Sequence, residues 1–107
     1  MAEDSLDRLA AVIAARRGAD PESSYTASLF ASGRARIAQK LGEEAIETVI
    51  AACGRDDAAI VPEAADLLYH LIVLLADAGL SLDDVRAELT QREGQSGHDE
   101  KAARSTI

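Results

Sequence analysis

The segment from Pro62 to Ala78 constrains the fold most, because its apolar residues point in nearly every direction once it is wound into a helix. Its centre, Leu67 to Ala76, is interrupted only by Tyr69 and His70. A helix that is apolar on all sides must be surrounded by other protein or by lipid. We judge the run too short to cross a bilayer. It therefore predicts a central helix covered by protein, with no membrane insertion. The helix is expected to start at Pro62, because proline is favoured in a first helical turn and disrupts the interior of a helix.

The remaining segments also read as helices. Apolar residues recur at helical intervals in stretches expected at about 5–17, 34–53 and 82–92. A loop at 18–24 and a short turn ending at the breaker Gly33 separate the first two, and Gly54 is expected to end the second. No segment shows the alternation typical of strands. The sequence predicts an all-α fold, with a single domain over residues 1–92 and a flexible C-terminal tail over 93–107.

Few helices are available to cover the central one. Three others of modest length could hardly enclose it in a monomer, so the pattern predicts a helical bundle completed by homo-oligomerisation, as a homodimer or homotetramer. Within the segment 34–53, a stripe formed by Ile46, Val49, Ile50 and Cys53 is expected to face the core. Cys53 is expected to act there as a small apolar residue.

The charge balance limits the possible partners. The formal charge of -8 and the pI near 4.6 disfavour a nucleic-acid binder, which would need clusters of Lys and Arg. The single cysteine cannot form an intrachain disulfide, and no N-terminal signal pattern is apparent. A cytoplasmic protein is the expectation. Any anionic substrate would need a cation as intermediary.

Two acidic clusters carry the chemistry. Lys40, Glu43, Glu44 and Glu47 fall on one ridge of their helix, and Glu63 and Asp66 are neighbours on the next. A short connection makes the two helices an antiparallel hairpin, so ridge and pair can face each other. Carboxylates brought together repel one another unless they take up protons or a cation neutralises them. The pattern predicts a site for Mg²⁺, which takes oxygen ligands and often binds substrate phosphates.

A simpler explanation exists for each cluster alone. Glu43 and Glu47 could belong to a solvated helix face, and Glu63 could be a favourable carboxylate in a first helical turn. Asp66 lies a turn deeper, immediately before the all-round apolar run. With both clusters on consecutive helices, metal binding is the favoured interpretation.

The spacing of these acids resembles a known signature. Glu-Glu-x-x-Glu at 43–47, followed after fifteen residues by Glu-x-x-Asp at 63–66, is similar to the motif pair of the all-α MazG-type nucleoside triphosphate pyrophosphohydrolases. Ser24-Tyr25-Thr26, residues 40–47 and residues 65–71 most resemble the phosphoribosyl-ATP pyrophosphatases of histidine biosynthesis. The resemblance covers about residues 6 to 92. It implies a MazG-like fold and Mg²⁺-dependent hydrolysis of 1-(5-phosphoribosyl)-ATP to 1-(5-phosphoribosyl)-AMP and pyrophosphate, the second step of that pathway.

The resemblance also suggests roles for single residues. It carries the metal-ligand pattern onto Glu44, Glu47, Glu63 and Asp66. Glu43 is then the candidate for general base or outer-shell ligand. Lys40 could contact a substrate phosphate, or it could form an i, i+4 ion pair with Glu44.

A second group of candidates precedes the acidic ridge. Ser24, Tyr25 and Thr26 occupy a loop-to-helix junction, where their hydroxyls and amides could bind substrate phosphate or ribose. Thr26 could equally cap the short helix. His70 is favoured as a hydrogen-bonded core residue over a ligand contact, and Tyr69 as a packing residue with a satisfied hydroxyl.

Two alternatives to the favoured function remain. A housecleaning enzyme on the same scaffold would share the metal motif but hydrolyse noncanonical or deoxynucleoside triphosphates. A non-enzymatic acidic bundle would serve as an interaction module, and its carboxylates would be solvated surface. The second alternative predicts a melting temperature that does not change with millimolar Mg²⁺.

Overall fold

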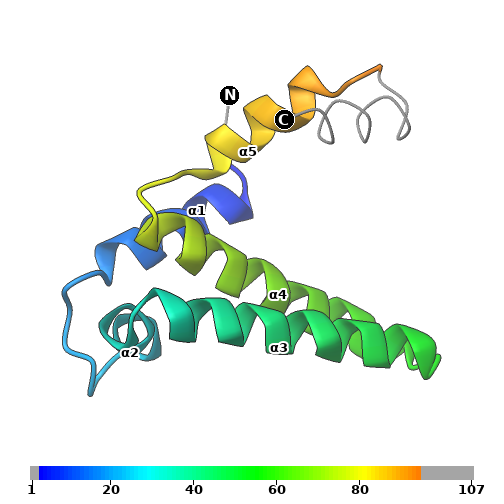
Figure 1. Ribbon diagram of the computed structural model, residues 1–107, viewed down its shortest axis with the longest axis horizontal. Helices are drawn as coiled ribbons and strands as arrows, with labels where there is room; N and C mark the ends of the chain where they lie inside the picture. The colour runs from blue at the N-terminus through cyan, green and yellow to red at the C-terminus, as the bar shows by residue number, and fades with distance from the viewer. Residues whose placement is uncertain (1–2, 95–107) are drawn as a thin grey trace.

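A computed structural model describes residues 3–94, and every regular element in that range is an α-helix. The helices are α1 (Ser5–Ala15), α2 (Tyr25–Ser32), α3 (Arg34–Cys53), α4 (Asp57–Asp77) and α5 (Leu82–Gln91). The long helices α3 and α4 form an antiparallel hairpin, and α1 packs along α4 (Figure 1). The all-α prediction is confirmed. The predicted tail lies almost entirely outside the described residues.

Local sequence explains most of the helix ends. Asp4 caps α1 and Ser81 caps α5, each in a capping box whose acidic partner lies three residues on. Ser24 caps α2 by accepting a hydrogen bond from the Ala27 amide at 3.1 Å. Gly33, with φ of 92°, lets the chain turn from α2 directly into α3, which confirms it as a breaker.

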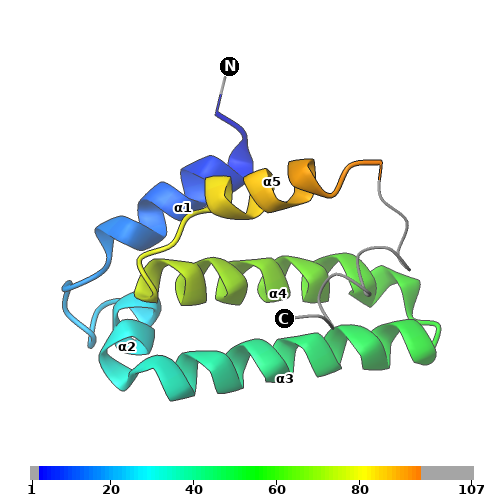
Figure 2. The same ribbon diagram turned by 45° about the horizontal axis from the view of Figure 1, so that its top comes forward.

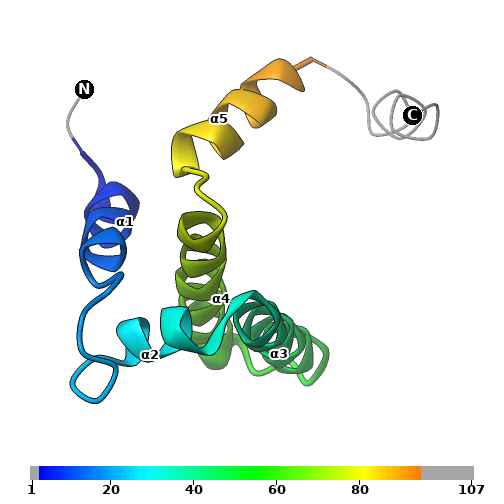
Figure 3. The same ribbon diagram turned by 60° about the vertical axis from the view of Figure 1, so that its left-hand side comes forward.

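One prediction about this part of the chain is wrong and another is confirmed. The segment 25–32 is a full helix rather than a short turn, and it crosses one end of the α3–α4 hairpin (Figure 3). The helix α3 ends at Cys53 with Gly54 as its C-cap, as predicted. Gly54 itself keeps ordinary helical angles, and the next residue, Arg55, takes the left-handed conformation with φ of 59°. The Asp56 amide then donates to the Ala51 carbonyl at 2.9 Å, which closes the turn.

The start of α4 was predicted wrongly. The helix begins at Asp57, so Pro62 lies inside it rather than in its first turn. Proline there removes only the hydrogen bond that its amide would donate to Ala58, and the carboxylate of Asp57 favours an early start by interacting with the helix dipole. Glu63 consequently lies in the second turn of α4 and not in the first. The explanation of Glu63 as a first-turn carboxylate no longer applies.

The core lies where α1, α2, α3 and α4 meet. It is built from five buried aliphatic side chains: Ile13, Leu29, Ile37, Ile72 and Val73. Arg86 connects α5 to the start of α1, because its guanidinium pairs with Asp7 at 2.8 Å as well as with Asp83 of its own helix at 2.9 Å. This core occupies one end of the α3–α4 hairpin, and no other helix within residues 3–94 covers the opposite end (Figure 1 and Figure 2).

The stripe expected to face the core points outward instead. Ile46, Val49 and Ile50 are 57–63% exposed, and Cys53 is exposed as well. The face of α3 that meets α4 carries Ile37 and Ala51 instead, because these residues fall on the opposite side of the helix. The prediction that Cys53 is a core residue is wrong for the single chain. Exposed apolar residues on α3, with Val61 and Leu68 on α4, leave a large apolar area uncovered.

The helix α4 is also longer than the apolar run that suggested it. By length and composition alone it could cross a membrane, with a mean hydropathy of 1.7 over an 18-residue window that is 17% buried. The prediction that this apolar segment is too short to cross a bilayer is therefore wrong. Against a lipid environment stand Glu63 and Asp66 on the same helix, because carboxylates within a bilayer are costly unless they are partnered.

Candidate metal centre

The antiparallel hairpin places the two acidic clusters at the same level. Glu44 and Asp66 each lie eleven residues from Arg55 in the connecting turn, and Glu47 and Glu63 each lie eight residues from it. Residues equidistant from a tight turn stand opposite one another in a pair of antiparallel helices. The register of the hairpin therefore follows from the short loop at 54–56.

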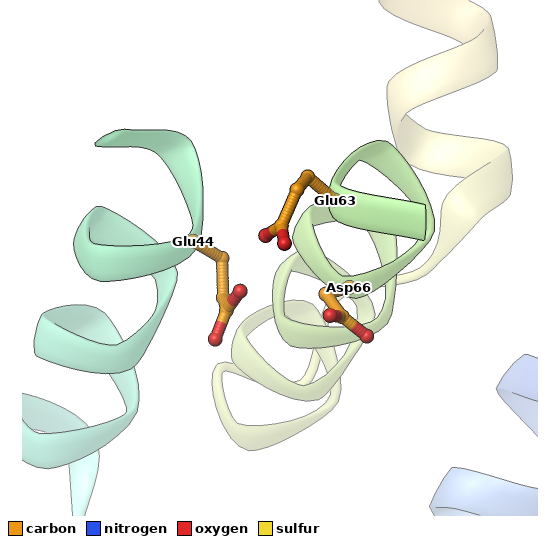
Figure 4. A group of neighbouring side chains, drawn as sticks. All are labelled: Glu44, Glu63 and Asp66. Atoms are coloured by element: carbon orange, nitrogen blue, oxygen red, sulfur yellow. The ribbon is translucent and has the colours of Figure 1, made fainter. Parts of the chain in front are cut away.

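Three carboxylates converge between the helices. Glu44 from α3 and Glu63 and Asp66 from α4 each offer an oxygen, and these atoms all lie within 4.8 Å of one another. In Figure 4 the side chains of Glu44 and Glu63 extend toward each other across the gap, with Asp66 one turn further along α4. Glu44 and Glu63 are half-buried, and Asp66 is exposed. This geometry suits a cation reached from solvent.

The electrostatics of Glu63 reflect this crowding. Partial burial raises the pKa of the Glu63 carboxyl above its ordinary value of 4.5, and the nearby charges of Glu47, Asp66 and Glu44 raise it further. Glu47 is exposed and is not one of the three converging groups, but its charge acts on Glu63. A group of oxygen donors that repel one another in this way fits a hard divalent cation such as Mg²⁺.

Glu43 faces a different set of partners. Its carboxylate accepts a hydrogen bond from Gln39 at 3.1 Å and pairs with Lys40 at 3.3 Å and, more loosely, with Arg36 at 3.9 Å. The hydrogen bond from Lys40 contributes most to lowering the pKa of Glu43, followed by the one from Gln39. A carboxylate held ionised in this way is a weak proton acceptor. The structure does not bring Glu43 into the group of three.

The ion pair of Lys40 differs from the one considered from sequence. Lys40 pairs with Glu43 three residues on rather than with Glu44 four residues on. Its side chain is 22% exposed and shares the ridge of α3 that leads to Glu44. Arg36 lies outside the predicted site residues. The sequence could have indicated Arg36, because residues four apart are neighbours on a helix surface and Arg36 is four residues before Lys40.

The hydroxyls of the segment 24–26 all have protein partners. Ser24 caps α2, the Tyr25 hydroxyl lies 3.2 Å from Nε2 of His70, and the Thr26 hydroxyl is hydrogen-bonded to that of Tyr69. Nδ1 of His70 lies 2.7 Å from the backbone carbonyl of Asp66, to which it can only donate. His70 is buried with both ring nitrogens paired, which confirms the core interpretation. Tyr69 likewise has a satisfied hydroxyl, as expected.

An apolar pocket lies away from these carboxylates. A cavity of about 280 Å³ between α1, the end of α4 and the start of α5 is lined by apolar residues with Arg17 and Ser81, and no carboxylate reaches it. The chemistry suggested by the carboxylates therefore belongs to the open hairpin face and not to this cavity.

The raised pKa of Glu63 gives a stability prediction. The pKa of the Glu63 carboxyl is higher in the folded state than in the unfolded state. Below pH 4.5 the carboxyl is protonated in both states and has no effect on the free energy of unfolding. As the pH rises through the folded-state pKa, the ionised carboxylate destabilises the fold. Without metal, Glu63→Gln should therefore melt a few degrees above the wild type at pH 7.5, and the difference should vanish near pH 4. Thermal melts in EDTA, followed by circular dichroism, measure this difference.

The matched control is Glu88→Gln, which removes an exposed carboxylate paired with Arg92 on α5. It should give no such gain. Adding Mg²⁺ should raise the melting temperature of the wild type and not that of Glu63→Gln. A loss of stability in Glu63→Gln that is equal at both pH values would contradict the repulsion argument.

The chain is similar to known proteins over most of its length. Residues 6–93 match the family model described as phosphoribosyl-ATP pyrophosphohydrolase. The chain is 63% identical over 100 residues to the phosphoribosyl-ATP pyrophosphatase of Rhizorhabdus wittichii, covering 94% of each chain. It is 60% identical to that of Azospirillum brasilense over 99% of this chain and 100% of the relative, and 59% identical to that of Zymomonas mobilis over 97% of each.

Proposed function

The chain belongs to the phosphoribosyl-ATP pyrophosphohydrolase family, and from this premise we propose that it hydrolyses 1-(5-phosphoribosyl)-ATP to 1-(5-phosphoribosyl)-AMP and pyrophosphate. This is the second step of histidine biosynthesis. The observation that carries the proposal is the convergence of Glu44, Glu63 and Asp66 within 4.8 Å on the α3–α4 hairpin. The enzyme is a hydrolase acting on a phosphoric anhydride bond.

Mg²⁺ is the proposed cofactor. Glu44, Glu63 and Asp66 would hold it, and Glu47 would join them after a small change of its exposed side chain. The donor set fits, because it is made only of oxygens and because the Glu63 carboxyl is disfavoured as an anion until a cation neutralises its neighbours. When bound, the metal neutralises triphosphate charge and orients the attacking water.

The surrounding residues would then bind and orient the substrate. Lys40, on the same ridge, is placed to contact a phosphate oxygen, and Glu43 keeps its ammonium in position. We assign Glu43 to this outer role rather than to general-base catalysis, because its carboxylate is already committed to Lys40 and Gln39. Water attacks the α-phosphorus and loses a proton to solvent, the bond from that phosphorus to the oxygen bridging the α and β phosphates breaks, and pyrophosphate leaves.

The segment 24–26 retains a proposed part in substrate binding. The hydroxyl contacts of Tyr25 and Thr26 with His70 and Tyr69 tie the start of α2 to α4, two turns or less from Asp66. Tyr25 is 54% exposed, so its ring is open to a ligand while its hydroxyl stays paired. Ser24 would act indirectly, by capping the helix that carries the other two.

The active form is proposed to be a homodimer or a pair of such dimers. The exposed apolar residues of α3 and α4 need a cover, and a second copy of the same hairpin would complete a four-helix bundle. The cytoplasmic location and the single domain over residues 1–92 remain predictions from sequence.

A substrate comparison tests the function. Pyrophosphate release should be fastest with phosphoribosyl-ATP and at least about a hundredfold slower, in kcat/KM, with ATP or dUTP, because each lacks the second phosphoribosyl group. Preference for dUTP or ATP would favour a housecleaning enzyme instead. No release from any of the three would favour the non-enzymatic module.

A further inference from the structure

The first half of α3 carries a concentration of positive charge in a chain with a formal charge of -8. Arg36 and Lys40, here named the basic ridge, share one carboxylate, Glu43, at 3.9 and 3.3 Å. Two cations on one anion leave a net positive charge. Arg34 differs, because it has its own partner in Asp77, at 2.5 Å.

The basic ridge is aligned with the metal centre. Arg36, Lys40 and Glu44 follow one another at intervals of four residues, so each is displaced by only about 40° around α3 from the next. At a rise of about 1.5 Å per residue, Lys40 lies about 6 Å and Arg36 about 12 Å along the axis from Glu44. Positive charge thus extends from the carboxylates along the helix, away from the α3–α4 turn.

The substrate of the proposed function has two anionic ends. Its triphosphate belongs at the metal centre, and its second phosphate lies beyond a ribose, the adenine and another ribose. That distal phosphate has no metal to neutralise it and needs a cation on the protein at some distance from Glu44. The side chain of Arg36 is 47% exposed, its guanidinium is only loosely paired with Glu43 at 3.9 Å, and its planar donors suit a phosphate.

We infer that Arg36 binds the distal phosphate of the phosphoribosyl group and so helps the enzyme distinguish phosphoribosyl-ATP from ordinary nucleoside triphosphates. Lys40 lies between the two ends and contacts the triphosphate. Glu43 holds both cations on the ridge until substrate displaces the weaker contact, which is the one to Arg36. The inference rests on the proposed function, whose substrate it takes as given.

The test compares phosphoribosyl-ATP with ribosyl-ATP, which lacks only the distal phosphate. Arg36→Gln should lose about 10- to 100-fold in kcat/KM with phosphoribosyl-ATP, mainly through KM, since it removes a hydrogen-bonded charge pair. With ribosyl-ATP the change should stay below threefold. Arg36→Lys should give an intermediate KM. The matched control is Arg34→Gln, with the same charge change on another side of α3, which should behave as wild type with both substrates.

Equal losses of Arg36→Gln with both substrates, or a loss confined to kcat, would overturn the inference. The inference would also be overturned if Arg36→Gln and Arg34→Gln had the same kcat/KM with each substrate while the wild type turns over phosphoribosyl-ATP. If the wild type releases no pyrophosphate from phosphoribosyl-ATP, the proposed function fails first. If Arg36→Gln does not fold, Arg36→Lys decides, because an unchanged KM in that folded variant with both substrates would equally contradict bidentate binding by Arg36.

Discussion

Replacing Glu44 by glutamine should lower kcat for pyrophosphate release from phosphoribosyl-ATP by about a thousandfold. Glu44 is the member of the group that α3 contributes, and its oxygen lies within 4.8 Å of those of Glu63 and Asp66. Its loss takes one anionic ligand from the metal, and a metal contributes several kcal/mol to charge stabilisation in such reactions. About 4 kcal/mol corresponds to a thousandfold in rate. A coupled assay for pyrophosphate at saturating Mg²⁺ measures it.

Three further variants make this result specific. Asp66→Asn should fall by a similar factor, because it removes a ligand from the opposite helix. Glu43→Gln should lose only about 10- to 100-fold, as expected for a residue that positions Lys40 from outside the ligand group. Glu88→Gln, on α5, should keep full activity. Near-normal turnover in Glu44→Gln would remove it from the ligand set.

The second large effect is expected at the uncovered face of the hairpin. Ile50→Asp should convert the enzyme from a multiple of the 11.3 kDa chain to the single chain at micromolar concentration. Ile50 is 63% exposed, so a lone chain tolerates the carboxylate. In an interface that covers residue 50, the aspartate would be buried as an unpaired charge. Burying it costs about 3 kcal/mol or more, which weakens association at least about a hundredfold. Sedimentation equilibrium measures the mass.

Val12→Asp is the control for that experiment. Val12 is 52% exposed on α1, away from the α3–α4 apolar residues, and the same substitution there should leave the mass unchanged. Wild-type protein that sediments as a single chain would refute the proposed oligomer. Equal dissociation by both variants would show that the interface is not centred on the hairpin.

The convergence of Glu44, Glu63 and Asp66 was predictable from sequence, because only helix periodicity and the length of the connecting turn determine it. Helical periodicity fixes which residues share a face, and a short turn fixes the register of the hairpin, so Glu44 and Asp66 had to meet. The same helical periodicity takes Glu43 out of the group. It adjoins Glu44 in sequence, but one residue is a rotation of about 100°, which carries its side chain away from α4 and toward Arg36 and Lys40.

Two other features, the start of α4 and the outward stripe of α3, depend on opposing energetic effects whose balance cannot be read from the sequence. Proline is favoured in a first turn, yet the helix α4 extends one turn before Pro62 because the gain in helix exceeds one lost hydrogen bond. Ile46 and Ile50 form an apolar stripe as regular as a core stripe, and periodicity cannot tell burial within a chain from burial between chains. Both faces of α3 are thus apolar, and only one meets α4.

The dependence of catalysis on a metal held by the hairpin can be measured most directly with one assay. Pyrophosphate release from phosphoribosyl-ATP by the wild type is followed first with Mg²⁺, then with excess EDTA, then after Mg²⁺ is restored. We expect release in the first and third conditions and none in the second, because the carboxylates of Glu44, Glu63 and Asp66 would hold the metal that the proposed reaction requires. The same rate in EDTA would contradict the assignment of these carboxylates as a catalytic metal centre.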